Sequence, residues 1–328
     1  MASMQDIADR LGVSKGTVSL VLSGKSKNRV GEELRKKVIS TAESMDYHVN
    51  EVARSLRTGK TNTVGVIVTD ISNEFFGKLS YCIQERAKKF GYLVLIANSN
   101  ESDEEMEKVT GILVQKKVDG IIAVPTENCK NSLQKIVDSN IPLVQVDRYV
   151  DGIKASFVGV NNYGSSSAGV EKLINTGCRK IGLINYDLNL SALNERRIGY
   201  IDIMKEHGLL DKSLIRNIDY NKQEEDIEEA LDYFFKERKD LDAVYFTSRR
   251  VFLTGMKNIS KRKIAVPKGF RFLCFDEIEF LLSEGYEIVY VEQPISKIGT
   301  KALDLVMDGI NGDSTTGNFL FDATFNVL

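Results

Sequence analysis

The stretch DIADRLGVSKGTVSLVL, Asp6 to Leu22, decides the fold at the front of this chain. Apolar residues recur at helical spacing on both sides of Gly12, which predicts two short helices joined by a tight turn. Gly12 can take the positive φ that ends the first helix, and Ser14 is a preferred cap for the second. Ala8 leaves room for the second helix to approach, and Val18 is expected to fill the angle between the two.

The second helix of this pair is expected to leave one side exposed, where it could contact a partner. Its apolar side turns inward, so the other residues lie at its leading turn or on its exposed side. They are Lys15, Gly16, Ser19 and Leu20. In helix-turn-helix proteins, this part of the second helix reaches base edges in the major groove of DNA. The alternative is a plain helical hairpin with a solvated polar end, and the Ala-Gly-Val spacing together with the local charge favours DNA.

The charge of the front segment supports a polyanionic partner. Residues 1–60 hold 11 Lys and Arg against 7 Asp and Glu, a net charge of +4, whereas the whole chain has a net charge of −2. A third amphipathic helix is expected within residues 31–47, with an apolar stripe of Leu34, Val38, Ile39, Ala42 and Met45. A small basic three-helix module on an acidic body predicts that the module alone binds nucleic acid.

A short basic segment, NEVARSLRTGKTNT at residues 50–63, follows the third helix. It is too short to hold a helix in water unaided, but it could fold on binding DNA. A helix here could push Leu56 between base steps of the minor groove and place Arg54, Arg57 and Lys60 on phosphates. A flexible linker with an incidental leucine is the alternative.

Composition excludes several classes of protein. The 328 residues are 42% hydrophobic and 27% charged, which is typical of a soluble globular protein. No run approaches the ~18 consecutive apolar residues that a membrane span needs, and the start MASMQDIADR has no apolar signal core. We therefore expect a cytoplasmic protein with no membrane partner.

Cysteine and histidine give no sign of a metal or cofactor. Cys82, Cys129, Cys178 and Cys274 lie far apart, without a C-x-x-C pair, and His48 and His207 are the only histidines. Buried free thiols are the expected state of the cysteines. No G-x-G-x-x-G follows the strands expected at Val64 and Ile181, no P-loop is present, and no nucleophile, base and orienting group stand together. The sequence therefore argues against an enzyme, including one that uses a dinucleotide.

Strands and helices alternate from Val64 onward, which predicts an α/β fold with doubly wound parallel sheets. Two similar lobes are expected, with these strand-like runs in chain order: VGVIVT, YLVLIA, GIIAV and PLVQV in the first lobe, and KIGLIN, DAVYF, FRFLCF and EIVYV in the second. The expected division is a DNA-binding module at 1–48, a hinge or linker at 49–62 and an effector-binding and dimerisation domain at 63–328. Within that domain, one lobe is expected over about 63–161 and 293–321, and the other over about 162–292 and 322–328.

Ligands of such sheets bind beyond the carboxyl ends of the strands, so a cleft between the lobes would gather residues from these loops. The candidates are Asp70, Phe75, Phe76, Asp147, Arg148, Arg196, Tyr220 and Asp276. Aromatic faces with carboxylates and guanidinium groups suit a small polyol or a nucleobase. Phe76 could instead belong to the core, and Asp147, Arg148 and Asp276 could be caps or salt-bridge residues.

Residues 5–63 resemble the DNA-binding part of the lactose-repressor (LacI/GalR) family, and the likeness continues across nearly the whole chain. It rests on DIADRLGVSKGTVSLVL, ELRKKV, DYHVNEVARSLRTGKT and VGVIVTDISNEFF in the family's order. The resemblance implies that Lys15, Gly16 and Leu20 read bases, that Thr17 and Ser19 contact the DNA backbone, and that Leu56 is the minor-groove wedge. The remaining DNA-binding candidates are Ser14, Lys25, Asn50, Ala53, Arg54 and Arg57. Leu20 stands where many relatives have arginine, so the operator should differ there.

The body is similar to the periplasmic sugar-binding proteins to which this family is related. By that resemblance Arg196 begins an R-x-x-G-aromatic motif, Asp276 is the late effector-binding aspartate, Tyr220 stacks on a ring, and Phe75 with Phe76 supplies pocket aromatics. TSRR at 247–250 departs from a stretch that often carries Asn-Asp, and Asn161 replaces an aspartate. Ser248 or Arg249 in the cleft would favour an anionic or larger saccharide over a standard hexose.

The sequence thus predicts a DNA-binding transcription regulator, a repressor that acts as a homodimer on a near-palindromic operator of double-stranded DNA. A small-molecule effector, a sugar or sugar derivative, would control operator affinity through lobe closure. Co-repression by a nucleobase is the alternative within the same class. No sustained heptad tail follows the last expected strand, so the sequence offers no argument for four subunits.

Overall fold

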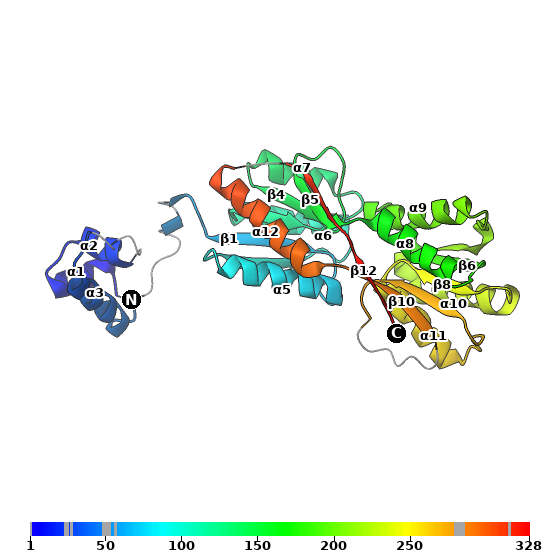
Figure 1. Ribbon diagram of the computed structural model, residues 1–328. Helices are drawn as coiled ribbons and strands as arrows, with labels where there is room; N and C mark the ends of the chain where they lie inside the picture. Colours follow the sequence, from blue (N-terminus) through cyan, green and yellow to red (C-terminus); the bar gives the residue numbers. More distant parts are fainter. Residues whose placement is uncertain are drawn as a thin grey trace. The chain divides into compact units, whose positions relative to one another are not determined.

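A computed structural model describes residues 2–22, 26, 29–47, 54–55, 58–278, 286–313 and 316–328. The chain divides into two compact units, Met1–Thr61 and Asn62–Leu328 (Figure 1). We call the first unit the head and the second the body. Within the described ranges, no helix has both the length and the apolar character needed to cross a membrane.

Within the described part of residues 2–47, the head has three helices that pack around a small apolar core. Its helices are α1 (Met4–Leu11), α2 (Lys15–Leu22) and α3 (Glu32–Ser44). Its buried residues are Ile7, Ala8, Val18, Val21, Val38 and Ala42. Gly12 ends α1 with φ of 64°, and the backbone N–H of Val13 donates to the carbonyl of Ala8 at 3.0 Å, which closes the turn. The predicted helix, turn and helix are therefore present, with Val18 fully buried between them.

One residue of the expected apolar stripe on α3 was predicted wrongly. Ile39 is 40% exposed, whereas Val38 and Ala42, one turn apart, are buried. A helix in so small a module has only one neighbour-facing side, and Ile39 lies 100° around the helix from Val38. Tyr47 packs back onto the core, and its N–H donates to the carbonyl of Ala42 at 2.9 Å.

The first lobe of the body is a three-layer α/β sandwich. Its strands are β1 (Thr63–Val68), β2 (Leu93–Asn98), β3 (Gly120–Ala123), β4 (Leu143–Val146), β5 (Ser156–Val160) and β11 (Asn318–Phe321). They pair in the order β11-β5-β4-β3-β1-β2, and every neighbouring pair is parallel. The covering helices are α5 (Glu74–Lys88), α6 (Asp103–Gln115), α7 (Lys130–Asp138) and α12 (Ile295–Asn311). Helices α5 and α12 pack on one face, and α6 and α7 on the other.

The second lobe repeats this plan. Its strands are β6 (Ile181–Tyr186), β7 (Ile215–Ile218), β8 (Ala243–Phe246), β9 (Arg271–Phe275), β10 (Glu287–Glu292) and β12 (Thr324–Val327), in the order β12-β10-β9-β8-β6-β7. Only the β10–β12 pair is antiparallel among these described strands. The larger helices are α8 (Asn162–Asn175), α9 (Ser191–Glu206), α10 (Gln223–Asp232) and α11 (Arg249–Arg262). Helices α8 and α9 cover one face, and α10 and α11 cover the other.

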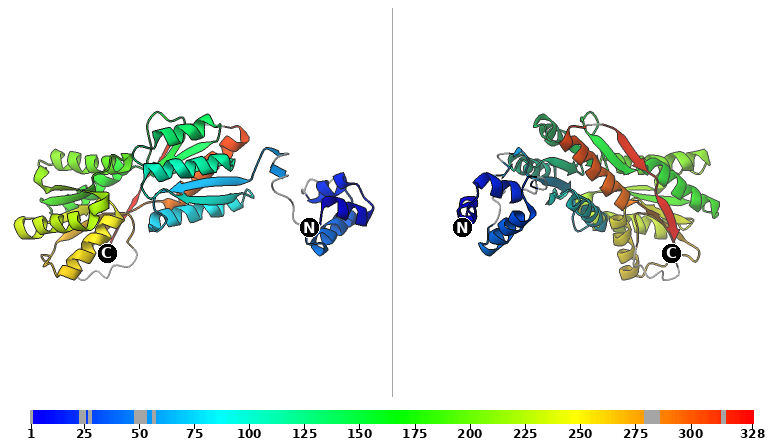
Figure 2. Two further views of the ribbon diagram at one scale, coloured as in Figure 1. Left: turned by 180° about the vertical axis from the view of Figure 1, so that it is seen from behind. Right: turned by 60° about the vertical axis from the view of Figure 1, so that its left-hand side comes forward.

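The chain passes between the lobes three times. The passages lie between β5 and α8, between β10 and α12, and between β11 and β12. The last passage is the long red segment that runs from one lobe into the other in both figures (Figure 2). The two six-stranded sheets confirm the predicted two-lobed fold with doubly wound sheets. The sequence patterns did not single out β5 and β7, because SFVGV contains a glycine and IRNI is half polar.

Candidate functional site

The first turn of α2 in the head presents polar groups to solvent. The Thr17 N–H donates to Ser14 Oγ at 3.0 Å, so Ser14 caps the helix as predicted. Lys15 and Gly16 are exposed, while Val18 is buried in the head core. The positive end of the helix dipole and a lysine at one exposed turn suit a polyanion.

The other predicted DNA-binding residues have mixed positions. Ser14 is exposed, and Thr17, Ser19, Leu20 and Arg54 are half-buried. Five candidates lie outside the described residues, namely Lys25, Asn50, Ala53, Leu56 and Arg57. The leading turn of α2 is therefore the part of this predicted surface that the structure displays.

The body holds a cavity between its lobes, where the carboxyl ends of the two sheets face each other. The space, including the open solvent at its mouth, is about 670 Å³. Its walls come from Thr69, Asp70, Asn73, Phe75, Phe76, Glu101, Asp147, Arg148, Tyr186, Leu188, Leu190, Ala192, Leu193, Arg196, Tyr220, Ser248, Arg250, Asp276 and Gln293. We call this cavity the cleft pocket.

Arg148 organises one side of the cleft pocket. Its Nη1 and Nη2 donate to the two carboxylate oxygens of Glu101, and its Nε donates to Asp147 Oδ2 at 3.4 Å. The side chains of Arg148 and Glu101 are only 9% and 8% exposed. Burial raises the pKa of Asp147, although Arg148 and Arg196 both oppose that rise. Glu101 and Asp147 therefore share the guanidinium of Arg148. Asp147 has the weaker share, so a hydrogen-bond donor on a ligand would stabilise its buried carboxylate.

Arg196 is held in a single orientation from α9. Its Nε donates to Asn162 Oδ1 and its Nη1 to the carbonyl of Thr247, each at 2.8 Å. The guanidinium carbon lies 3.6 Å from the centre of the Phe275 ring, which is a close cation–π contact. Two hydrogen bonds and an aromatic face fix the plane of the group, so its remaining donors point in a defined direction.

Asp147 and Asp276 occupy equivalent places in the two lobes. Each is the first residue after its strand, each has a positive φ, 67° and 90°, and each N–H donates to the carbonyl of a valine in or next to the neighbouring strand. Left-handed backbone at a residue other than glycine costs of order 1 kcal/mol and concentrates at functional sites. The Asp276 carboxylate also accepts a hydrogen bond from Gln293 Nε2. Each lobe thus offers one carboxylate in an uncommon backbone conformation.

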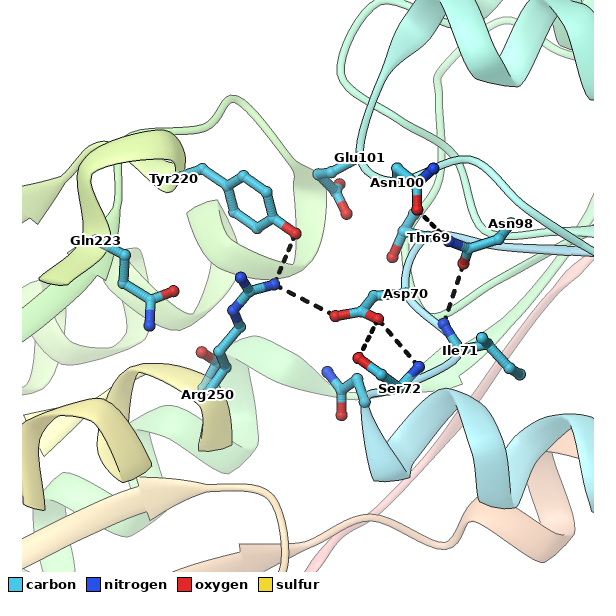
Figure 3. A network of polar contacts seen from close by, with 12 residues as sticks. Thr69, Asp70, Ile71, Ser72, Asn98, Asn100, Glu101, Tyr220, Gln223 and Arg250 are labelled. Carbon is cyan, nitrogen blue, oxygen red and sulfur yellow. Dashed lines mark hydrogen bonds and ion pairs between the residues drawn. The ribbon is translucent and has the colours of Figure 1, made fainter. Parts of the chain in front are cut away.

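Aromatic rings and a third arginine form the mouth of the cleft pocket. The rings of Tyr186 and Tyr220 lie 5.4 Å apart, and the Arg250 guanidinium carbon lies 4.9 Å from the Tyr220 ring centre. Arg250 Nη1 donates to Tyr220 Oη at 2.8 Å and to Asp70 Oδ2 at 3.3 Å, and so links the two lobes (Figure 3). Burial raises the pKa of Tyr220, which therefore remains a neutral phenol at physiological pH.

Most of the predicted effector-binding residues line this one cavity. They are Asp70, Phe75, Phe76, Asp147, Arg148, Arg196, Tyr220, Ser248 and Asp276. Phe75 and Phe76 are both almost fully buried and form an edge-to-face pair with ring centres 5.1 Å apart. Each ring packs in the core of the first lobe and also forms part of the wall of the cleft pocket, so the core and pocket interpretations of the sequence both apply.

Arg249 is the predicted residue that the structure does not place in the cleft pocket. Its guanidinium pairs with Glu74 of the other lobe, beside a second cross-lobe pair in which Lys78 Nζ lies 2.9 Å from Glu277 Oε2. These four side chains line a smaller hollow next to the cleft pocket. Arg250, one residue later on α11, lines the cleft pocket in its place. Position relative to a helix axis decides between adjacent arginines, and the sequence does not fix that rotation.

Several lining residues were missed although a signal for them exists. Glu101, Tyr186 and Gln293 stand at or just after the ends of β2, β6 and β10, so the rule that located Asp147 and Asp276 also covers them. The leucines at 188, 190 and 193 carry no such signal, since they read as ordinary core of a helix and its entry loop.

A two-lobed body with a charged cleft, together with a helix-turn-helix head, is the architecture expected of a ligand-responsive nucleic-acid-binding protein. Two family models match the chain: "Bacterial regulatory proteins, lacI family" over residues 3–50, and "Periplasmic binding proteins and sugar binding domain of LacI family" over residues 61–320. The chain belongs to the LacI family of bacterial transcription regulators. The predicted family is thereby confirmed, and so is the exclusion of an enzyme, since the family's members are regulators.

Known proteins of this family resemble the chain over nearly its full length. The probable HTH-type transcriptional regulator EndR of Paenibacillus polymyxa is 28% identical over 95% of this chain and 91% of its own. The HTH-type transcriptional repressor PurR of Actinobacillus pleuropneumoniae is 26% identical over 96% of this chain and 93% of its own. A crystal structure of the lac repressor dimer bound to operator and an anti-inducer superposes with a TM-score of 0.83 at 18% identity, over 99% of this chain and 97% of that one. That last likeness concerns the fold.

Proposed function

We propose that this protein represses transcription as a homodimer on a near-palindromic operator, and that a sugar or sugar derivative in the cleft pocket sets its affinity for that operator. The observation that carries the proposal is the cleft pocket itself, whose charged lining comes from both lobes. A ligand that touches both lobes binds one closure state better than the other, and it can shift operator affinity by that differential affinity alone. A regulator of this kind would act in the cytoplasm, where its operator lies.

The head supplies the DNA contacts in this proposal. The exposed leading turn of α2 would enter the major groove with Lys15 and Gly16 at base edges, and Leu20 further along the helix. Thr17 and Ser19 would contact the sugar-phosphate backbone. One such helix from each subunit of a dimer reads one half of a palindrome, because a two-fold protein matches a two-fold site.

The pocket chemistry supports a hydroxyl-rich ligand. Asp147 and Asp276 offer acceptors from opposite lobes, and Arg196 offers donors that are held in a fixed plane. A lining that combines carboxylates, guanidinium groups and apolar side chains suits a molecule with many hydroxyl groups and one apolar face. The family model that matches the body is that of a sugar-binding domain, which agrees with this chemistry.

A nucleobase is the second candidate for the effector. Tyr186 and Tyr220 lie close together at the mouth, and Phe75 stands in the wall. Aromatic faces of this kind can stack on a planar heterocycle, with Asp70 or Asp276 as acceptors for its ring N–H groups. In that case the ligand would act as a co-repressor that raises operator affinity.

Two measurements on the purified full chain test the proposal. Selection from random DNA should return a near-palindromic site, and failure to select any such site would remove the regulator function. A thermal-shift screen of sugars, sugar acids, sugar phosphates and nucleobases should then find a stabilising ligand, since 100 times Kd adds ~2.7 kcal/mol. The hit must change operator affinity in a gel-shift titration, and its class decides between the two effector candidates.

A further inference from the structure

The three arginines of the cleft pocket differ in how firmly their partners hold them. Arg148 is buried and binds Glu101 with both terminal nitrogens. Arg196 is buried against Phe275 and donates to Asn162 and the Thr247 carbonyl. Arg250 is 43% exposed, and both of its hydrogen bonds come from Nη1. Its Nε and Nη2 donate to none of the residues that the structure describes, so one edge of this guanidinium remains for a ligand.

The carboxylate that faces Arg250 can release it at little cost. Asp70 Oδ1 accepts from the Ser72 N–H at 3.0 Å and from Ser72 Oγ at 2.5 Å, and these local bonds do not involve Arg250 (Figure 3). Only Asp70 Oδ2 contacts Arg250, at 3.3 Å, and the Asp70 side chain is 27% exposed. Exposed ion pairs of this geometry contribute between zero and about 1 kcal/mol. Asp70 therefore stays hydrogen-bonded when another anion takes over Arg250.

The start of α11 adds positive potential at the same place. Its first turn contains Arg249 and Arg250 and no acidic residue, whereas positive charge at a helix N-terminus is unfavourable. In the structure the compensating carboxylates come from the opposite lobe, Glu74 for Arg249 and Asp70 for Arg250. Arg249 is already committed to Glu74 outside the cleft pocket. An anionic ligand at Arg250 would take the place of Asp70 as the negative charge at this helix end.

The inner end of the cleft pocket calls for different chemistry. Apart from Asp70 and Arg250, the charged residues that line the cleft pocket are Arg148, Arg196, Glu101, Asp147 and Asp276, so their formal charge is −1. A ligand anion at that end would meet like charge, whereas hydroxyl groups can donate to the carboxylates. The position of an anionic group is thereby restricted to the mouth.

We propose that Arg250 selects effectors with a carboxylate or phosphate at their outer end, held on the Tyr220 ring while hydroxyl groups fill the inner end. This inference rests on the proposed effector function of the cleft pocket and goes beyond it by naming the charge of the ligand. A sugar acid and a sugar phosphate both satisfy the chemistry, and the experiment separates them. The planar guanidinium can bind either group through two parallel hydrogen bonds, which lysine cannot do.

The test uses matched neutral and anionic ligands on the full-length protein. Isothermal titration and thermal shift would compare glucose with glucuronate and glucose 6-phosphate, ribose with ribose 5-phosphate, and further sugars paired with their acids and phosphates. The variants are Arg250→Gln and Asp70→Asn, with Lys222→Gln as the control. Lys222 is exposed and lines the outer hollow beside Tyr220, but it does not line the cleft pocket. Lys222→Gln removes one positive charge, as Arg250→Gln does, and therefore controls for the change in net charge.

We expect at least one anionic ligand to bind roughly 10-fold more tightly than its neutral partner, the size of one charge-assisted hydrogen bond. Arg250→Gln should remove that difference, because the anionic ligand should lose more affinity than its neutral partner, while Asp70→Asn should increase the difference. Opposite effects of two variants at one contact cannot arise from misfolding. Lys222→Gln should change little.

Three results would overturn the inference. They are equal or tighter binding of the neutral ligands, an equal loss of both ligand types in Arg250→Gln, and no stabilisation by any anionic member of the set. Operator binding is measured in parallel on every variant. A chain that still selects its operator but prefers neutral ligands would keep the proposed function and lose the role of Arg250.

Discussion

In the proposed function, single side chains set what each part of this protein recognises, and Leu20 is an example in the head. It is half-buried on α2, just before the buried Val21. An aliphatic side chain can contact a thymine methyl group but cannot make the bidentate guanine contact that arginine makes. Base preference at one position of each half-site should therefore depend on this residue.

Leu20→Arg should shift that position toward guanine, with ~1 to 3 kcal/mol of discrimination gained over the other bases. Binding-site selection with both proteins would measure the shift. Lys36→Arg on the exposed side of α3 is the control, because it adds a guanidinium to the head away from α2. An unchanged set of selected sites for Leu20→Arg would show that this residue does not read bases.

Asp103 gives a prediction about pH at the same scale. Burial by itself would raise the pKa of its carboxyl, but hydrogen bonds from Thr126 Oγ1 at 2.6 Å and from Asn128 outweigh burial and lower it. A carboxyl with a lowered pKa in the folded protein stabilises the fold above its unfolded pKa of about 3.8, and that contribution is lost as the pH falls through the folded value.

Asp103→Asn should therefore be less stable than the parent chain at pH 7, and the difference should shrink as the pH falls below about 3.8. Urea unfolding of both proteins between pH 3 and 7 measures it. Thr126→Val, which removes one of the donors, should reduce the pH-dependent part without abolishing it. A stability difference that stays constant over the whole range would contradict the assignment.

At the scale of elements, the contact between α8 and α9 sets the position of Arg196. Gly199 lies one turn after Arg196 on α9, and a Cβ there would come within 2.6 Å of the Tyr163 carbonyl and 3.0 Å of Ser166 Cβ. The two helices can approach this closely because Gly199 has no side chain. The same closeness fixes where the guanidinium of Arg196 enters the cleft pocket.

Gly199→Ala should lower stability by ~1 to 3 kcal/mol through overpacking, although alanine is the better helix former by about 1 kcal/mol. It should also weaken ligand binding, because α9 must move away and take Arg196 with it. Gly111→Ala on α6 is the matched control, since its new Cβ would meet only Lys135 Nζ at 3.8 Å. That control should be neutral or stabilising in the same chemical unfolding series. A stable Gly199→Ala would show that the helices can separate at no cost.

Local chemistry explains how much of the elements could be predicted from the sequence. Gly12 and Ser14 act within a few residues of their own position, so the head could be read from its motif. Most strands could be predicted because they are short apolar runs in the sequence. The cleft residues next to them could be predicted because ligands of parallel sheets bind beyond the carboxyl ends of the strands. β7 is half polar, and its place in the sheet comes from its parallel pairing with β6, a long-range contact that no local pattern displays.

The parts of the site that could not be predicted depend on rotation or on distant pairing. Arg249 and Arg250 are adjacent in sequence, yet one points to Glu74 and the other to Asp70, because 100° separates them around α11. The pairing of Arg148 with Glu101 joins residues 47 positions apart. Neither relation leaves a mark on the local sequence.

At the scale of the whole body, ion pairs between the lobes bear on closure. Lys78 on α5 contacts Glu277 after β9, and Arg249 contacts Glu74, next to the cleft pocket rather than within it. Lys78 and Glu277 are 36% and 30% exposed, so this pair contributes between zero and about 1 kcal/mol to the arrangement of the lobes in this structure. A contribution of that size matters to an equilibrium that a ligand shifts by ~1 to 3 kcal/mol.

Lys78→Glu should open the lobes and weaken binding of whichever ligand favours closure, by up to about fivefold for a pair of this exposure. Glu277→Lys should do the same, and the double variant should restore part of the loss. Fluorescence transfer between one dye on each lobe measures closure, at low and at high salt, because screening should reduce the difference. Additive effects in the double variant would show that the two side chains do not interact.

The three passages between the lobes also have a consequence for how the protein is made. The sheet of one lobe includes β11 and the sheet of the other includes β12, so neither sheet is complete until the ribosome has passed Phe321 and Val327, respectively. The head needs only its first 47 residues and can fold while translation continues. During synthesis, a nascent chain therefore carries a finished DNA-reading unit long before it has any means of responding to a ligand.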